Sequence, residues 1–509
     1  MLEIMREKPF LAVDLGAASG RAVLGTFEGR RLTVSHVHRF ENRPVRLGGT
    51  VYWDFLFLWG NVIESLALCA SRGAGELAAI GIDSWNLDFA LVDKAGKLLA
   101  NPLSYRDKDA EWACGRIASA VGYLEMYRET GIPPLPITGL ARLIQMRRGG
   151  GTKLLDLARW YLPIPDLVRY YLTGDASIEE TIAWGTQMVS VAGRKWSRKL
   201  VELFDIPKRI LPGLVPSGGK ASPLSREISE ITGLGPCPVL PVAEHDTMSA
   251  VFTAHRLDRN AAILSAGTWS VFGSVIDAPL VSLEAMEKGF LNEIAYRSIF
   301  LGKNLMGFFL LEEFLKCWRA KGIECDYDSV AALARSSPPK CFRLDPNDPL
   351  FFSPPNLEAA FGKYCEKTGQ ETPASPYEGS LRPGVSPGRV PPGKFASGRG
   401  SPMGEIGVIT RALYEGLAAS YARALEDLNV LLHTRFASIV MVGGGVRNGL
   451  FCQLVADACR VKVVAGPAEA TALGNLCIQA LATERIRAED LGDLLEASFE
   501  VGTYLPRGA

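Results

Sequence analysis

The chain has 509 residues, and its 55 lysines and arginines balance 55 aspartates and glutamates, so the formal net charge is zero. This length predicts two large domains, and the balanced charge argues against nucleic acid or anionic lipid as a partner. No apolar run approaches the ~20 residues that span a bilayer, and residues 1–10 lack a signal-peptide core. The ten cysteines are scattered without a C-x-x-C pair, which favours reduced thiols over zinc. We therefore expect a cytoplasmic protein with no membrane partner.

Residues 11–27, LAVDLGAASGRAVLGTF, predict two strands joined by a turn of small residues. Such a turn directs several backbone N–H groups toward one point, which suits a phosphate. The turn residues are Ala17, Ala18, Ser19, Gly20 and Arg21. Asp14, at the end of the first strand, is a candidate to hold Mg²⁺, and an Asx-type turn is the alternative for it. The segment is no Walker loop, because Gly16 and Gly20 are too close and Arg21 stands where lysine is required.

Alternating strands and helices follow, as expected for α/β layers. We predict strands at 31–40, 78–85 and 89–93, and a helix over 56–72. From about 106 to 187 the pattern is helical and rich in aromatic residues. We interpret this stretch as an insertion that builds a lid or pocket on an N-terminal domain of residues 1–255.

The strand PVLPVA at 238–243 leads into Glu244-His245-Asp246-Thr247, where a helix begins. A carboxylate at such a strand end points into whatever cleft lies above the sheet. Asp246 could there accept the proton of an attacking hydroxyl, as phosphoryl transfer to an alcohol requires. A helix N-cap is an equally good interpretation of Asp246, and Thr247 would also serve as a cap.

The second half, 256–509, opens with a similar hairpin at 262–274, AILSAGTWSVFGS. Two such hairpins about 250 residues apart suggest a duplicated domain whose turns face each other and grip a phosphate chain. That is the layout of an actin-like nucleotide-binding protein, with ATP as the ligand. We predict helices at 304–322, 448–460 and 469–483 and strands in ASIVMVGGG (437–445) and VKVVAGP (461–467). Residues 371–405 are more than half Pro, Gly and Ser, which predicts a flexible surface insertion.

Three consecutive glycines, 443–445, lie between a predicted strand and helix. They allow close approach of a flat ring or a ribose to the backbone. A Rossmann site is disfavoured, because the third glycine comes one position late, at Gly449, and no acidic residue ends the following strand.

Taken in order, DLGAASGR, GIDSWNLDF, YRD, EHDT, SAGTWS, VGGGVRN and AGPAEATALGN resemble the FGGY carbohydrate kinases. KNLMG and DPNDPLFF resemble the rhamnulokinase branch of that family. The resemblance covers nearly the whole chain except 371–405. It implies two actin-like, ribonuclease H-like domains with ATP and a sugar bound in the cleft between them, and Mg²⁺ as the metal.

The resemblance also implies roles for individual residues. The catalytic base falls on Asp246, which would also contact the metal, and His245 and Thr247 lie beside it at the sugar. Thr268 matches a phosphate contact, and Asn304, Glu312 and Gly444 fall at further ligand-contacting positions. Two residues depart from the family pattern: Asn86 stands where the branch has Gly, and Glu312 where Gln is usual. Asn86 adds an amide that can bind a sugar hydroxyl.

The sequence thus predicts an ATP-dependent kinase for a primary hydroxyl of a ketose, with L-rhamnulose as the substrate. One alternative is a kinase of the same family for another ketose, such as L-fuculose or xylulose. The other is an actin-like ATPase without a sugar substrate. EHDT and the 106–187 insertion argue against the ATPase.

Overall fold

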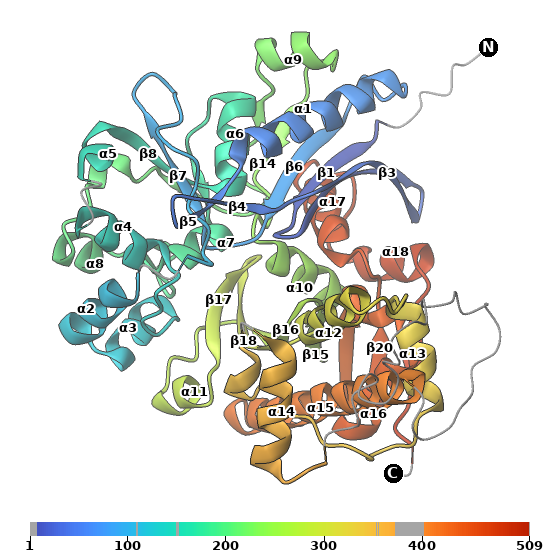
Figure 1. Cartoon of the computed structure of the whole chain (residues 1–509). Coiled ribbons are helices and arrows are strands. Elements are labelled where there is room, and N and C mark those ends of the chain that lie inside the picture. The colour runs from blue at the N-terminus through green and yellow to red at the C-terminus, as the bar shows by residue number, and fades with distance from the viewer. Residues whose placement is uncertain are drawn as a thin grey trace, which may run out of the picture. The chain divides into compact units, whose positions relative to one another are not determined.

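The computed structural model describes residues 8–107, 110–148, 152–352, 354, 356–371 and 402–507. The chain forms two compact units (Figure 1). The first comprises Met1–Arg259, Ser274–Gly302 and Glu469–Glu500, and the second Asn260–Gly273, Lys303–Ala468 and Val501–Ala509. The predicted domain boundary at 255/256, and the expectation that the two turns face each other, stay predictions.

A six-stranded sheet of order β13-β14-β6-β1-β2-β3 forms the centre of the first unit. Its strands are β1 (Phe10–Leu15), β2 (Ser19–Glu28), β3 (Arg31–Glu41), β6 (Ala79–Ser84), β13 (Ser222–Pro223) and β14 (Pro238–Leu240). β1 pairs antiparallel with β2 and parallel with β6. Every residue of β1 and β6 is buried, as expected for parallel strands covered on both faces. The predicted first hairpin is therefore confirmed.

The other large sheet has seven strands in the order β17-β18-β16-β15-β19-β20-β21. Its strands are β15 (Ala262–Ala266), β16 (Trp269–Ile276), β17 (Leu291–Ala295), β18 (Ser298–Met306), β19 (Ser438–Val442), β20 (Lys462–Ala465) and β21 (Gly502–Tyr504). β15 pairs antiparallel with β16 and parallel with β19. The succession β18-β16-β15-β19-β20 thus repeats β3-β2-β1-β6-β14. The internal repeat predicted from the two hairpins is present in the topology.

Segments from both ends of the chain build the first unit, as Figure 1 shows where red α17 and α18 lie beside blue β1 and β3. Its larger helices are α1 (Phe55–Ser71), α6 (Ile164–Thr173), α9 (Arg226–Thr232), α10 (Asp246–Leu257), α17 (Ala470–Ala482) and α18 (Leu491–Ser498). A Cβ on Gly81 of β6 would lie 2.3 Å from Oδ1 of Asn475 in α17. A Cβ on Gly474 would lie 2.0 Å from the carbonyl oxygen of Ser249 in α10. These glycines let α17 pack directly against β6 and α10.

The 106–187 region contains more than helices. It holds α2 (Glu111–Val121), α3 (Tyr123–Thr130), α4 (Gly139–Arg148), α5 (Thr152–Leu157), β8 (Ala158–Pro163), α6, β9 (Ile178–Glu179), α7 (Glu180–Ala183) and η1 (Trp184–Thr186). The prediction of a helical pattern is wrong at β8, which pairs antiparallel with β7 (Phe89–Asp93). Tyr161 of β8 stacks on Phe89 with ring centroids 4.2 Å apart. Cross-strand aromatic packing of this kind outweighs the local helical pattern.

Short elements complete the first unit. They are β4 (Pro44–Leu47), β5 (Thr50–Trp53), β10 (Val189–Ser190), β11 (Lys195–Trp196), α8 (Arg198–Leu203), η2 (Lys208–Ile210), β12 (Leu214–Val215) and α11 (Leu283–Glu287).

The second unit carries its helices α12 (Phe309–Ala320), α13 (Tyr327–Ser336), η3 (Pro349–Phe351), α14 (Leu357–Thr368), α15 (Pro402–Leu431), η4 (Gly444–Arg447) and α16 (Gly449–Cys459). The predicted helix start at 304 is wrong, because residues 304–306 end strand β18. Gly307 separates strand from helix, and a Cβ there would lie 2.3 Å from the carbonyl oxygen of Gly267. Residues 372–401 of the predicted insertion lie outside the described residues.

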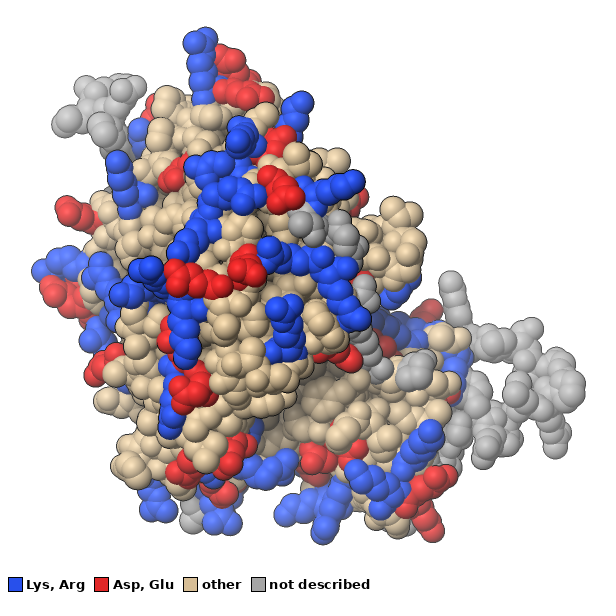
Figure 2. Space-filling view, turned by 90° about the vertical axis from the view of Figure 1, so that its left-hand side faces the viewer, with Lys and Arg blue, Asp and Glu red and all other residues tan. Residues whose placement is uncertain are grey.

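Charge on the face shown in Figure 2 is mixed, with lysine and arginine side chains interspersed among aspartate and glutamate. Within the described ranges, no helix is both long and apolar enough to cross a membrane.

Candidate active site

Three carboxylates meet at the carboxyl ends of neighbouring strands in the first unit. Asp14 of β1 and Asp83 of β6 are directly opposite in the parallel register, and Ser84 forms a bridge with His245. Helix α10 begins at Asp246, as predicted, and His245 occupies the N-cap position without a side-chain cap bond. Among the described residues, Oδ1 of Asp246 accepts hydrogen bonds only from its neighbour Thr247, at 2.5 Å from the amide and 3.1 Å from the hydroxyl. Asp246 and Thr247 are therefore not the cap of this helix.

The pKa of the Asp246 carboxyl lies near neutral pH, above that of an ordinary aspartate. Burial, and then the negative charge of Asp14, raise its pKa to about 7. Its side chain is still 28% exposed, so a ligand can reach it. Burial and the charge of Asp14 also raise the pKa of Asp83 well above its ordinary value. A carboxyl poised near pH 7 suits general-base chemistry.

Asp83 is held from behind by the C-terminal segment. Nδ2 of Asn475 in α17 donates to its Oδ2 at 2.5 Å, and Gln479 donates to the Leu11 carbonyl of β1 at 3.0 Å. Oδ1 of Asp83 is buried and has no hydrogen-bond partner in the described part of the chain. An unpartnered buried carboxylate oxygen is costly, so this atom marks a place where a ligand or cation would be favourable.

Arg21, the last residue of the turn that is predicted to bind phosphate, forms ion pairs with two carboxylates. Its Nε and Nη2 contact Oδ2 of Asp14 at 2.8 and 2.6 Å, and Nη1 pairs with Glu469. These carboxylates outweigh burial and raise the pKa of Arg21. Glu469, at the start of α17, was not among the predicted site residues, although it lies in the quoted motif AGPAEATALGN.

The turn after β1 has free donors. The Gly16 amide donates to the Ser19 carbonyl at 3.0 Å, whereas the amides of Ala17 and Ala18 donate to no oxygen in the part of the chain that the structure describes. A Cβ on Gly20 would lie 2.2 Å from the ring of Phe40, so this glycine is required by packing. The turn thus offers two unused amides, which fits the predicted phosphate role.

A buried pair lies beside Asp246. Nδ1 of His245 is 3.4 Å from Oε2 of Glu293 in β17, and neither atom has a hydrogen-bond partner within the described ranges. Burial lowers the pKa of His245 to about 3, while burial and the charge of Asp246 raise that of Glu293 to about 8. At neutral pH, His245 is uncharged and the Glu293 carboxyl is largely protonated. Sequence reasoning did not find Glu293, which follows no motif.

Asn86 lies between the end of β6 and the insertion. It is buried, and its Oδ1 accepts from the Leu87 amide at 2.6 Å. A Cβ on Gly185 would lie only 2.0 Å from that Oδ1, so the insertion packs tightly on Asn86. Nδ2 of Asn86 and Nε1 of Trp184 are both buried, and neither has a hydrogen-bond partner among the residues that the structure describes. Two unused donors from these adjoining segments suit the oxygens of a sugar; Trp184 was missed, although the insertion was expected to build a pocket.

Behind the EHDT segment lies a buried ionic network. Nε of Arg169 donates to Oε1 of Glu244 at 2.8 Å, and the same guanidinium pairs with Asp166. Arg169 is 1% exposed and both acids are fully buried. The network fixes the backbone that carries His245 and Asp246.

In the second unit, the structure brings together Thr268 and Glu312. Thr268 lies in the β15–β16 turn and donates from Oγ1 to Oε1 of Glu312 in the first turn of α12 at 3.0 Å. Gly443 has φ +87°, and a Cβ there would lie 2.8 Å from the Ala266 carbonyl oxygen, whereas Gly444 faces open space. Asn304 is exposed on β18.

The carboxylates of Asp14, Asp83 and Asp246 suit a Mg²⁺ ion that takes few of its ligands from the protein. In the described ranges, no group of three or more His, Cys, Asp or Glu side chains is arranged to hold a metal. Mg²⁺ is usually held by one or two carboxylates together with substrate phosphates and water. The unpartnered Asp83 oxygen, and the mutual repulsion of Asp14 and Asp246, would both be relieved by a cation.

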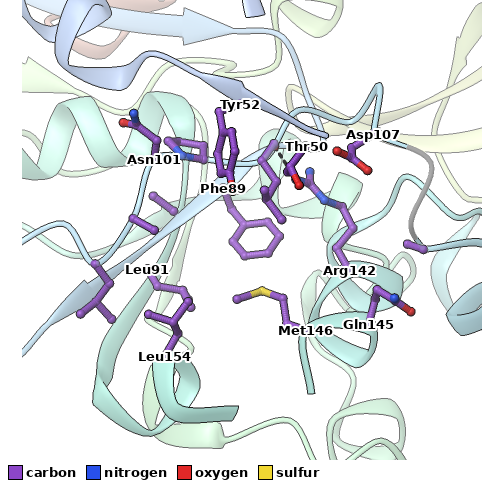
Figure 3. A pocket seen from close by; sticks show the side chains of 16 residues that line it. Thr50, Tyr52, Phe89, Leu91, Asn101, Asp107, Arg142, Gln145, Met146 and Leu154 are labelled. Carbon is purple, nitrogen blue, oxygen red and sulfur yellow. Dashed lines mark hydrogen bonds between the residues drawn. The ribbon is translucent and has the colours of Figure 1, made fainter. Parts of the chain in front are cut away.

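A pocket of about 320 Å³ in the first unit is lined by residues of β5, β7 and the 106–187 region and does not include Asp14, Asp83 or Asp246. Phe89, Leu91, Met146 and Leu154 form its apolar wall, with Arg142 at one side (Figure 3). Arg142 is already paired with the buried Asp88. Asp88 also accepts from the indole N–H groups of Trp53 at 2.6 Å and Trp85 at 2.7 Å.

Comparison with known proteins gives the family. Models of the N-terminal and C-terminal domains of the FGGY family of carbohydrate kinases match residues 10–253 and 262–483. The chain belongs to the FGGY family of carbohydrate kinases. It is 35% identical over 500 residues to a rhamnulokinase of Bacteroides thetaiotaomicron, covering 98% of this chain and 96% of that protein. It is 31% identical to a rhamnulokinase of Enterococcus faecalis, covering 95% and 91%.

Solved structures of other kinases share the fold. A xylulose kinase from Lactobacillus acidophilus superposes with a TM-score of 0.75 at 18% identity, covering 98% of this chain and 94% of that one. Plasmodium falciparum glycerol kinase with ADP gives 0.73 at 16% identity, covering 98% and 94%. The prediction of a two-domain α/β carbohydrate kinase is confirmed.

Proposed function

We propose that this FGGY kinase transfers the γ-phosphoryl group of ATP to the 1-hydroxyl of L-rhamnulose. The observation that carries the proposal is the Asp246 carboxylate, accessible at the start of α10 with a pKa of about 7. Rhamnulokinases that match nearly the whole chain support the sugar.

The sugar is held by the unused polar groups around Asp246. Asn86 and Trp184 offer one N–H donor each. His245 is uncharged and adds a ring nitrogen, and Thr247 and Asn304 are further contacts. Because a buried donor left unpaired is costly, these groups favour a polyol of matching stereochemistry.

The protein then contributes mainly positioning and electrostatic stabilisation to the transfer of the phosphoryl group. Asp246 orients the primary hydroxyl and accepts its proton as the oxygen attacks phosphorus. The free amides of Ala17 and Ala18, the hydroxyl of Ser19 and the Thr268 side chain hold phosphate oxygens. Arg21 keeps Asp14 in place by the pair described above. Mg²⁺, held by Asp14 and Asp246, would neutralise charge on the phosphates.

On the nucleotide, we assign Glu312 and Gly444 to the remaining contacts. Glu312 carries charge where the family has a neutral amide, and its bond to Thr268 partly satisfies that charge. We place the reaction in the cytoplasm, which agrees with all ten cysteines being free thiols.

Two other functions remain open to test. A different ketose, such as L-fuculose or xylulose, is favoured by Asn86, which adds bulk where the rhamnulokinase branch has Gly. An ATPase without a sugar substrate is disfavoured by the unpaired donors of Asn86 and Trp184, which have no role in ATP hydrolysis. ADP release across a panel of ketoses decides among the three.

The decisive variant is Asp246→Asn, with Asp493→Asn as its control. Asn keeps the shape but cannot accept the proton, so we expect kcat to fall at least ~10²-fold, with the Kd for ADP nearly unchanged. Asp493 is an exposed partner of Arg30, so its variant should keep full activity. Wild-type turnover by Asp246→Asn would remove Asp246 from the mechanism.

A further inference from the structure

A second cleft in the first unit, of about 680 Å³, lies at the end of α10 remote from Asp246. Three separate segments contribute its charged wall. Arg256 and Arg259 come from the end of α10, Arg297 from the β17–β18 turn and Arg487 from the segment after α17, against the acids Asp277 and Glu484. The cleft therefore gathers more positive than negative charge.

Most of these arginines lack acidic partners. Among the described residues, Arg256, Arg259 and Arg297 form no ion pair, whereas Arg487 pairs with Glu489 and Asp490. Nε of Arg256 is buried without a hydrogen-bond partner. Burial and then the charge of Arg259 lower the pKa of Arg256. A buried guanidinium nitrogen without a partner is costly, and an anion at this place would satisfy the Nε of Arg256 and offset its repulsion by Arg259.

The helix dipole accounts for only part of this arrangement. Cations at a helix C-terminus are favourable, which explains His255 and Arg256 in the last turn of α10. It does not explain Arg297 and Arg487, which come from other elements and face the same cleft. His255 adds no charge at neutral pH, because burial and the neighbouring arginines lower its pKa to about 4.

We propose that this cleft is a regulatory site for a compact polyanion, a small molecule with two phosphate groups. Guanidinium groups bind phosphate oxygens through paired hydrogen bonds, and the three arginines that form no ion pair among the described residues exceed what one monoanion needs. This site lies outside the proposed sugar and nucleotide contacts, so the inference goes beyond the proposed function.

Three elements that end at the cleft also carry residues of the carboxylate site. α10 begins at Asp246, β17 carries Glu293, and α17 carries Asn475, which binds Asp83. The rings of Phe252 in α10 and Tyr296 in the hairpin turn are in edge contact, with centroids 4.9 Å apart. An anion that draws Arg256 and Arg297 together therefore acts on α10 and β17 at once. A shift of these two elements would move Asp246, at the start of α10, and Glu293, in β17.

The test is calorimetric titration of inorganic pyrophosphate into the full-length protein, in magnesium-free buffer with saturating ADP to fill the nucleotide site. The test variant is Arg259→Gln/Arg297→Gln; both side chains are exposed, so folding should persist, as thermal denaturation checks. The control is Arg226→Gln/Arg435→Gln, which removes the same charge from exposed positions that do not line the cleft. We expect the Kd to rise at least ~10-fold in the test variant only.

Regulation is tested by kinetics at saturating ATP. Pyrophosphate should change kcat or the sugar KM at least twofold in the wild type and in the control, but not in the test variant. Direct competition at the nucleotide site would persist in all three proteins and would overturn the regulatory role. Absence of wild-type binding, or equal Kd values in test variant and wild type, would overturn the site itself. The calorimetric arm needs no turnover, so its failure is separate from failure of the proposed function.

Discussion

The raised pKa of Asp246 predicts that kcat/KM falls on the acidic side of its pH profile, which we call the acidic limb. A base must be deprotonated, so activity is lost as pH falls through its pKa, here about 7. The deprotonated fraction, and with it kcat/KM, then falls about tenfold from pH 8 to pH 6 and about ninetyfold to pH 5. An ordinary carboxyl near pKa 3.9 would lose less than about one tenth of its activity at pH 5.

The assay is direct detection of ADP at limiting L-rhamnulose, which avoids pH-sensitive coupling enzymes. Asp14→Asn removes the negative charge that raises the pKa of Asp246, so the limb should move to lower pH even though kcat also falls. That shift separates titration of Asp246 from general acid unfolding, which circular dichroism at each pH would reveal. A profile that is flat from pH 5 to pH 8 would refute the electrostatic reasoning.

Two further substitutions probe specificity and stability. Asn86→Gly should change the ratio of kcat/KM between L-rhamnulose and xylulose with little effect on the KM for ATP; an equal factor for every ketose would make Asn86 structural. Arg169→Met leaves Glu244 without its buried partner and should lower the free energy of unfolding in urea by about 3–5 kcal/mol, while Arg198→Met, in an exposed pair, should cost below about 1 kcal/mol. Similar losses in both would contradict a special role for the buried network.

Local patterns predicted several elements of the first unit well. Asp14 lies near the end of β1 and Asp246 at the start of α10, as the sequence predicted, while their roles stay predictions. Both hairpins, the start of α10 at Asp246 and the glycines after β19 lie where expected. These features depend on short segments whose periodicity and turn chemistry are local.

What sequence did not reveal depends on long-range packing. Glu293 sits in an ordinary strand, and only the fold places it 3.4 Å from His245. Trp184 becomes a candidate contact because Gly185 packs on Asn86. Strand β8 forms because β7, some 70 residues earlier, supplies its partner. None of these pairings leaves a periodic signal in its own segment.

The return of residues 469–500 to the first unit has a consequence for biosynthesis. While a ribosome is still adding the second unit, the sheet that holds Asp83 lacks Asn475 and Gln479, which satisfy its buried polar groups. At about 5–20 residues per second, the interval from residue 259 to 500 lasts on the order of ten to fifty seconds. Until its last helices are synthesised, the nascent N-terminal half therefore lacks α17, which packs on β1 and β6 in the folded protein. A fragment ending at residue 259 would remain in that state permanently.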